Sequence, residues 1–177
     1  MTVKQGWVGR YYEDFEVGDV YRFALGRTIT EADNIWFTLL TMNTNQLHFN
    51  NHYAARTEFG KPLVNSGFTL ALVLGMSVSD VSQNAMANLG WDRIRLDHPV
   101  FVGDTLHVES LVLSKRESKS RPNIGIVKVK TRGLNQHGQE CVSFTRSMMV
   151  YLRSAAEEVF SFPNPDTAIE QDEDQPS

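Results

Sequence analysis

The chain has 177 residues, of which 41% are hydrophobic and 21% are charged, and its formal net charge is −4. This length and composition fit one globular domain with a sizeable core, and they exclude a fibrous repeat or a wholly disordered chain. The single cysteine, Cys141, excludes an intramolecular disulfide, and the first residues lack the apolar run of a signal peptide. We therefore expect a cytoplasmic protein.

Acidic residues gather at the carboxyl end of the chain. Residues 157–177 hold seven acids and no Lys or Arg, so without them the charge of −4 becomes +3. Because this end is also poor in apolar residues, we expect a domain over 1–160 and a disordered acidic tail over 161–177. No dense Lys/Arg patch with interleaved aromatic residues is present, which excludes nucleic acid as a partner. The longest apolar stretch, 68–78, is too short to cross a membrane.

The amino-terminal half predicts one strand and three helices. Residues 19–29 mix aromatic and β-branched side chains and predict a strand. Thr30 caps a predicted helix over 31–41, and a short helix is expected over 51–57, before Gly60 and Pro62 turn the backbone. Residues 66–81 carry apolar side chains on every side of a helix, and this pattern predicts a helix that is buried all round.

The carboxyl-terminal half predicts four strands, in which branched or aromatic residues often alternate with polar ones. They cover residues 91–96, 105–113, 124–132 and 141–152. The segment 135–138 is typical of a hairpin turn and 102–104 of a turn before a strand, so we expect antiparallel pairing. An early strand, a buried helix and a meander describe an antiparallel sheet wrapped around a helix, which is an α+β fold.

The densest polar cluster is the segment 41–52, where His48 and His52 lie among Asn, Gln and Thr residues. It is either a loop that aims polar groups into a cleft or an ordinary Asn-rich connection. None of the five histidines lies in an HxH, HExxH or Cys/His spacing, so we expect no metal site. GxSxG, P-loop and GxGxxG motifs are also missing, which sets aside hydrolase elbows and nucleotide-phosphate loops.

Two stretches resemble the MaoC-like (R)-specific enoyl-CoA hydratase/dehydratase family. Between residues 43 and 62, the runs NTNQLH, YAA and FGKP are similar to the family's Asp-x-Asn-Pro-hydrophobic-His motif, its Ala-containing helix and its FG-P turn. Between residues 95 and 106, RLDHPVFVGDTL is similar to the family's RF-x-x-PV-x-x-GDTL strand and turn. The resemblance spans residues 11–152 and implies a single hot-dog fold, with the antiparallel sheet wrapped around the central helix.

The family implies an enzyme that adds water across the C2–C3 double bond of an enoyl-CoA thioester, or removes it. His48 is the implied acid/base, because an imidazole can both take and deliver a proton near neutral pH. The family's catalytic Asp falls on Asn43 and its Pro on Gln46. An amide exchanges no protons as a carboxylate does, and can only hold a water or orient a partner.

Three interpretations of Asn43 stay open. In the first, His48 moves the proton alone while Asn43 fixes the water. In the second, another carboxylate such as Asp33 or Glu58 approaches the site, although both suit helix capping and surface solvation. In the third, the protein binds acyl-CoA without catalysis.

The resemblance also implies substrate-binding residues: Asn45, Asn65, Ser66, Gly67 and Arg95. The family's His-Gly before the central helix reads Asn65-Ser66-Gly67 here. Backbone N–H groups at a helix N-terminus suit a thioester oxygen that gains negative charge, although plain capping explains the same residues.

The runs TMNTN, NLGWDRIRL and KRESKSRP look most like the subgroup that acts on branched dicarboxylyl-CoA thioesters, such as mesaconyl-CoA and β-methylmalyl-CoA. A free substrate carboxylate calls for a cation, which Arg27, Arg93 or Arg95 would supply. The basic segment 114–122 either meets the CoA phosphates or is a solvated hairpin tip.

Two other functions fit a hot-dog protein: an acyl-CoA thioesterase, which uses a carboxylate on or facing the central helix, and a catalytically inactive acyl-CoA-binding protein. Asp80 lies too near the end of the central helix to suit the thioesterase. No cofactor is expected, because CoA is part of the substrate. A homodimer or higher homo-oligomer is expected, because hot-dog sheets leave an edge and a broad face that need cover.

Overall fold

The structure is a computed structural model that describes residues 2, 4–155, 162, 163, 165–167 and 169. The expected domain boundary at residue 160 and most of the expected acidic tail, 161–177, lie outside the described residues. No helix in the described part of the chain is long and apolar enough to span a membrane.

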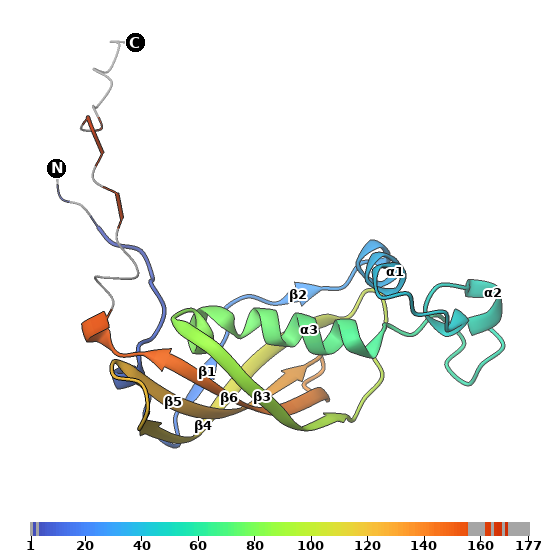
Figure 1. Cartoon of the computed structure of the whole chain (residues 1–177). Coiled ribbons are helices and arrows are strands. Elements are labelled where there is room, and N and C mark those ends of the chain that lie inside the picture. Colours follow the sequence, from blue (N-terminus) through green and yellow to red (C-terminus); the bar gives the residue numbers. More distant parts are fainter. Residues whose placement is uncertain (1, 3, 156–161, 164, 168, 170–177) are drawn as a thin grey trace, which may run out of the picture.

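One antiparallel sheet forms the body of the molecule, and helix α3 lies along one of its faces (Figure 1). The strand order is β1-β4-β5-β6-β3, and β2 also pairs with β4. The strands are β1 (Val20–Arg22), β2 (Arg27–Thr28), β3 (Ala85–Leu96), β4 (Thr105–Glu117), β5 (Ile124–Leu134) and β6 (Glu140–Tyr151). The predicted α+β fold with antiparallel pairing is confirmed, and so is the hairpin turn at 135–138.

Three α-helices precede the long strands: α1 (Glu31–Leu40), α2 (Asn51–Ala54) and α3 (Ser66–Met76). The start of α1 follows the prediction, because the Thr30 side chain accepts from the Asp33 N–H and the Asp33 carboxylate accepts from the Thr30 N–H. Helix α2 ends three residues earlier than predicted. Helix α3 ends at Met76, and a π-helical turn, Val78–Ser82, follows it.

The single strand predicted over 19–29 is wrong, because the chain forms the two short strands β1 and β2. At the break, Gly26 lies so close to His107 that a Cβ on it would come within 2.6 Å of the imidazole. Strand β3 begins six residues before its predicted start, and register shifts interrupt its pairing with β6. Such bulges disturb the alternation of apolar and polar residues from which a strand is predicted.

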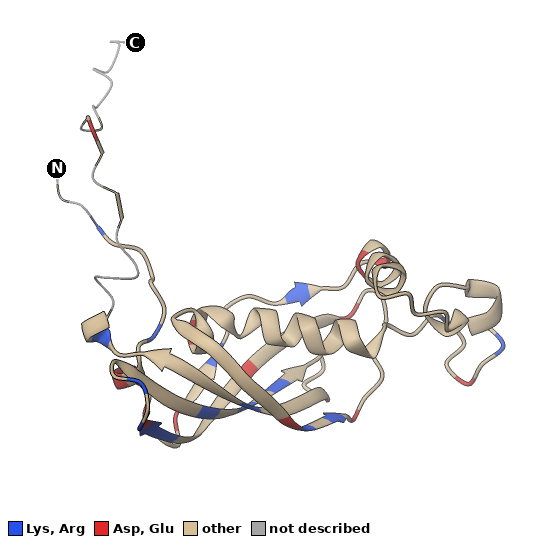
Figure 2. Cartoon of the chain, in the orientation of Figure 1, with Lys and Arg blue, Asp and Glu red and all other residues tan. Residues whose placement is uncertain are grey.

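The prediction that this helix is buried all round is wrong for the described chain, because helix α3 is exposed on one side. Thr69, Val73 and Met76 are buried towards the sheet, whereas Ala71 and Gly75 are exposed. The sheet covers one side of the helix, so the opposite side remains exposed. Figure 2 shows no charged residue on α3, so the exposed side is apolar or small in character.

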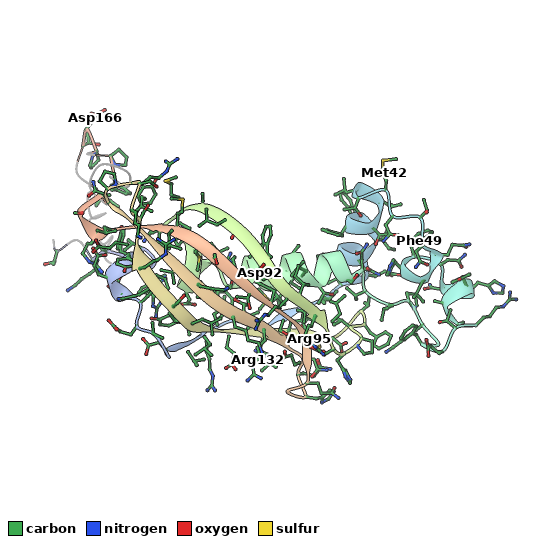
Figure 3. All side chains as sticks on the ribbon, turned by 60° about the horizontal axis from the view of Figure 1, so that its bottom comes forward. Met42, Phe49, Asp92, Arg95, Arg132 and Asp166 are labelled. Carbon is green, nitrogen blue, oxygen red and sulfur yellow. The ribbon has the colours of Figure 1, made fainter. Side chains whose placement is uncertain are left out.

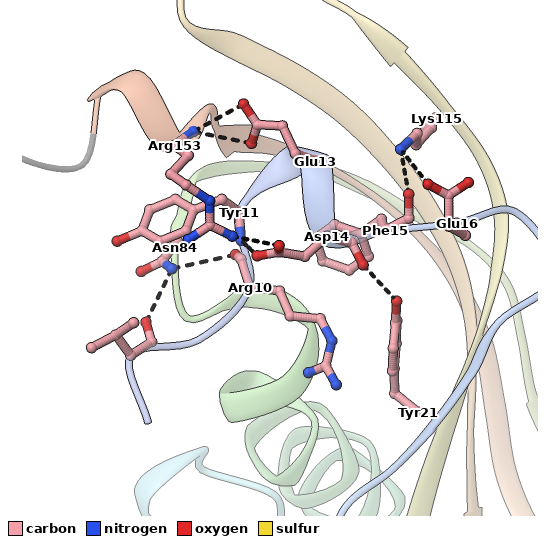
Figure 4. A network of polar contacts seen from close by, with 11 residues as sticks. Arg10, Tyr11, Glu13, Asp14, Phe15, Glu16, Tyr21, Asn84, Lys115 and Arg153 are labelled. Carbon is pink, nitrogen blue, oxygen red and sulfur yellow. Dashed lines mark hydrogen bonds and ion pairs between the residues drawn. The ribbon is translucent and has the colours of Figure 1, made fainter. Parts of the chain in front are cut away.

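The amino-terminal segment is tied to the sheet by polar contacts (Figure 4). The Asn84 side chain donates to the carbonyl oxygens of Val8 and Arg10, at 3.0 and 3.3 Å. The Arg153 N–H donates to both carboxylate oxygens of Glu13, at 3.0 and 3.1 Å. These bonds join the start of the chain to the ends of distant strands.

The core consists of two hydrophobic clusters, one around Val73 and Phe144 and the other around Phe15 and Met148. Arg146 lies on β6 between Phe144 and Met148 and is only 4% exposed. Its Nη2 donates to the hydroxyls of Ser77 and Ser82, both at 3.3 Å, and its Nε has no partner in the described chain. Burial lowers the pKa of Arg146 to about 10.

The substitution Arg146→Met is expected to stabilise the fold, because no carboxylate among the described residues compensates the buried charge. We expect the free energy of unfolding in urea at pH 7 to rise by roughly 1–3 kcal/mol. Below pH 10 the buried Arg146 is charged and destabilises the wild type, so the difference in stability between the variant and the wild type should shrink as the pH rises above 10. Arg121→Met, at an exposed position, serves as the control. A variant less stable than wild type at pH 7 would contradict the expectation.

Candidate active site

The polar segment 41–52 folds into a chain of side-chain caps. The Asn43 Oδ1 accepts from the Asn45 N–H at 3.0 Å, and the Asn45 Oδ1 accepts from the Leu47 N–H at 3.1 Å. The Asn50 Oδ1 then accepts from the Tyr53 N–H at the start of α2. These asparagines therefore shape the loop and cap its turns.

His48 ends the short 3-10 turn Gln46–His48 and is 9% exposed. Its Nδ1 lies 2.9 Å from the carbonyl oxygen of Leu63. A carbonyl oxygen only accepts, so the neutral imidazole carries its proton on Nδ1, and Nε2 is left with a lone pair. The arrangement leaves His48 able to act as a base through Nε2.

Asn34, on α1, connects the His48 turn to the start of α3. It is 1% exposed, its Nδ2 donates to the His48 carbonyl oxygen at 2.7 Å, and its Oδ1 accepts from the Asn65 N–H at 2.8 Å. The Asn65 side chain in turn donates to the Thr38 hydroxyl at 3.2 Å. A single buried amide thus holds two segments that flank the candidate site.

Sequence reasoning missed both Asn34 and Thr38. The signal that could have found them is their i, i+4 spacing on one side of a helix that is otherwise apolar from residue 35 to residue 40. Such a pair, when buried, must be hydrogen-bonded to another segment.

His48 lines a cleft of about 250 Å³ between α1, the 3-10 turn and the segment before α3. The cleft contains one carboxylate and one ammonium, those of Glu31 and Lys61, and neither was singled out as a site residue from the sequence. The other lining residues are Asn34, Ile35, Phe49, Asn51, Pro62 and Val102. Asn43 does not line this cleft.

The residues expected to bind substrate at the N-terminus of α3 lie there, but they do not line the His48 cleft. The Gly67 N–H donates to the Asn65 Oδ1 at 2.9 Å, so capping already uses this donor. Ser66 lines a second cleft, together with His98 and Cys141. The structure therefore links His48 to Asn65 through Asn34, and it places Ser66 in a cleft that His48 does not line.

The cations expected to meet a substrate carboxylate do not line the His48 cleft. Arg95 forms an ion pair with Asp97 at 3.0 Å, and Arg27 forms one with Asp33 at 2.9 Å. Figure 3 shows Arg95 among the strands and Phe49, a lining residue of the cleft, beside α2. Arg93 is exposed on β3.

The alternative carboxylates are also placed away from the cleft. Burial acts to raise the pKa of Asp33, but the hydrogen bonds from Thr30 and the charge of Arg27 outweigh it, so that its pKa is lowered. Glu58 is exposed and does not line the cleft. Asp80, the residue considered for a thioesterase, forms an ion pair with Arg10 at 3.1 Å.

The basic segment 114–122 covers the end of β4 and part of the connection to β5, and its residue Lys115 has a structural role. The Lys115 ammonium donates to the Phe15 carbonyl oxygen and contacts the Glu16 carboxylate, so it holds the amino-terminal segment. No contact among the described residues assigns the segment 114–122 to a ligand.

No group of three His, Cys, Asp or Glu residues in the described part of the chain is placed to hold a metal ion.

The fold and the site define a hot-dog protein of the MaoC-like class. A solved MaoC domain protein from Chloroflexus aurantiacus superposes with a TM-score of 0.81 at 30% identity, covering 96% of this chain and 46% of that one. A Mycobacterium tuberculosis protein with a double hot-dog fold superposes with a TM-score of 0.76 at 20% identity, covering 90% of this chain and 53% of that one. The expected hot-dog fold is therefore confirmed.

The family model described as mesaconyl-CoA hydratase matches residues 3–177, and the chain belongs to this family. It is similar to the mesaconyl-CoA hydratase of Cereibacter sphaeroides, with 35% identity over 148 residues. That match covers 84% of this chain and 43% of the relative, so the chain spans less than half the length of that curated protein.

Replacing Asn34 by Leu is expected to lower the free energy of unfolding by roughly 2–4 kcal/mol, because the His48 carbonyl and the Asn65 N–H would be left buried without this partner. The measurement is urea unfolding followed by circular dichroism. Trp36→Leu changes an exposed side chain of the same helix and should cost much less. Equal losses in the two variants would show that Asn34 is not the link described here.

Proposed function

We propose that the chain adds water across the C2–C3 double bond of an enoyl-CoA thioester, or removes it, and that a branched dicarboxylyl-CoA such as mesaconyl-CoA is a substrate. The observation that carries the proposal is the placement of His48, a buried imidazole held through Nδ1 with Nε2 left as a base. Membership of the mesaconyl-CoA hydratase family supports the substrate class. The reaction needs no cofactor, because CoA is part of the substrate.

In the proposed reaction, His48 Nε2 takes a proton from water as the water oxygen bonds to C3. The π electrons of the double bond move towards the thioester, whose oxygen gains negative charge. The proton on His48 then passes to C2, and the thioester carbonyl re-forms. One base thereby serves both steps on one face of the substrate. Removal of water follows the same path in reverse.

Three further residues have proposed roles in this reaction. Asn43 stays the residue predicted to hold the water; it does not line the His48 cleft, and its Oδ1 already accepts from the Asn45 N–H, so the role would fall to its amide NH2 at the edge of the loop. At the start of α3 the Gly67 N–H is bonded to Asn65, so the Ser66 N–H is the donor proposed for the thioester oxygen; the substrate would then extend from the His48 cleft to the cleft that Ser66 lines. Asn45 and Arg95 stay as predicted substrate-binding residues.

Turnover of crotonyl-CoA and mesaconyl-CoA, followed as loss of enoyl absorbance, tests the proposal. His48→Ala is expected to lower kcat by about 10²–10⁴-fold, because it removes the acid/base group. Release of free thiol without loss of the enoyl group would indicate a thioesterase instead. Binding of both thioesters without turnover would indicate an acyl-CoA-binding protein.

Asn43→Asp, measured in the same assay, separates the interpretations of this position. If Asn43 only holds the water, a carboxylate at the same place should leave kcat within roughly tenfold of the wild type. A much larger rise would show that the amide limits the hydratase. Asn50→Asp, in the same loop, is the matched control because its side chain has the equivalent capping bond.

We propose that the chain self-associates through strand β3 and the exposed side of α3. Strand β3 is at one end of the strand order, and it exposes four large apolar residues: Leu89, Trp91, Ile94 and Leu96, at 46–55%. An edge strand with apolar side chains needs cover, and a second hot-dog unit provides it. We also propose a cytoplasmic location, as the sequence predicts.

Sedimentation equilibrium tests the self-association. The wild type should sediment as a dimer or larger oligomer, and Ile94→Asp should sediment as a monomer, because a charge on this surface must be desolvated on pairing. Val17→Asp, at a residue of similar exposure away from β3, is the control and should keep the wild-type mass. A monomeric wild type would refute the proposed oligomer.

A further inference from the structure

Lys61 is the cation in the cleft that His48 lines. Its ammonium lies 4.3 Å from the centroid of the Phe101 ring, and no carboxylate in the described part of the chain lies within ion-pair distance of it. A cation that rests on an aromatic face is held in place while its N–H donors remain available. Lys61 can therefore still bind an anion that enters the cleft.

The same short segment, 61–63, positions Lys61 and orients His48. The Leu63 carbonyl oxygen accepts from the His48 Nδ1 at 2.9 Å, and the Leu63 N–H donates to the Leu47 carbonyl oxygen at 3.2 Å. Leu63 also forms a β-bridge with Phe101, whose ring supports the Lys61 ammonium. The base and the cation are thus both attached to one well-anchored segment.

The charge in the cleft is unevenly distributed. Glu31 lines the cleft as well, but it is not within ion-pair distance of Lys61. A ligand carboxylate would be repelled near Glu31 and attracted near Lys61. The cleft therefore distinguishes a ligand that carries a carboxylate from one that carries a methyl group in its place, and it favours one orientation of the former.

We propose that Lys61 binds the free carboxylate of a dicarboxylyl-CoA thioester while the double bond lies at His48, an inference that rests on the proposed function. In an enedioyl thioester such as mesaconyl-CoA, the free carboxylate is bonded directly to an alkene carbon. Its cationic partner must therefore lie in the same cleft as the base. Lys61 meets this condition, whereas Arg27 and Arg95 lie outside the cleft in ion pairs of their own.

Lys61→Met is the test, because Met keeps the length of the side chain and removes its charge. We expect kcat/KM for mesaconyl-CoA to fall roughly 10- to 100-fold, as for a lost hydrogen bond to a charged group. The value for crotonyl-CoA, which has a methyl group where mesaconyl-CoA has the carboxylate, should change less than threefold. Lys61→Arg should restore most of the preference for mesaconyl-CoA.

The matched control is Lys130→Met, which removes the charge of an exposed lysine on β5 and should leave both values unchanged. Equal losses on both substrates in Lys61→Met would overturn the inference, since they would indicate a general effect on the cleft. A loss confined to mesaconyl-CoA in Arg95→Met, with Lys61→Met unaffected, would also overturn it.

Calorimetric titration with two saturated thioesters separates this inference from the hydratase proposal. Succinyl-CoA carries the carboxylate and butyryl-CoA does not, and neither has a double bond to hydrate. Weaker binding of succinyl-CoA alone in Lys61→Met supports the inference even if no enoyl-CoA is turned over, in which case only the hydratase proposal fails. Unchanged binding of succinyl-CoA, with crotonyl-CoA still hydrated by the wild type, overturns the inference alone.

Discussion

The hydrogen bonds of the buried Asn34 amide are the contacts on which the candidate site depends. The side chain joins α1 to the His48 carbonyl and to the Asn65 N–H, and is almost fully removed from solvent. A buried amide is costly unless its donors and acceptor are all used, so the three segments are held in one relative position. The orientation of His48 and the first turn of α3 both follow from this arrangement.

The two ends of the sheet have different roles. At one end, the amino-terminal segment is bound by Asn84 and Arg153 and closes the second hydrophobic cluster (Figure 4). At the other end, the segments around His48 enclose a cleft and are joined by hydrogen bonds from the Asn34 side chain and the His48 ring. Arg146 lies between the two hydrophobic clusters, where a charge adds little stability.

The candidate site has Asn43 where the family motif has its catalytic Asp, and the cleft at His48 is built from other residues. The Asn43 side-chain oxygen accepts from the Asn45 N–H, and Asn45 in turn caps the 3-10 turn that carries His48. The charged groups are Glu31 and Lys61, which come from the start of α1 and from the segment before α3. The charged groups of the cleft therefore come from separate segments, and the motif contributes the imidazole and the loop that carries it.

The sequence by itself determined the local features. The cap at Thr30, the hairpin turn at 135–138 and the four long strands depend on neighbouring residues, and the motif around His48 is continuous in the chain. Only the tertiary structure decided that Asn34 bonds to the His48 carbonyl, that Lys61 lines the same cleft as His48, that Ser66 lines another cleft, and that α3 keeps an exposed side. These features depend on which distant segments meet, and on a sheet that covers one side of a helix. Periodicity reports which faces are apolar, but not what packs against them.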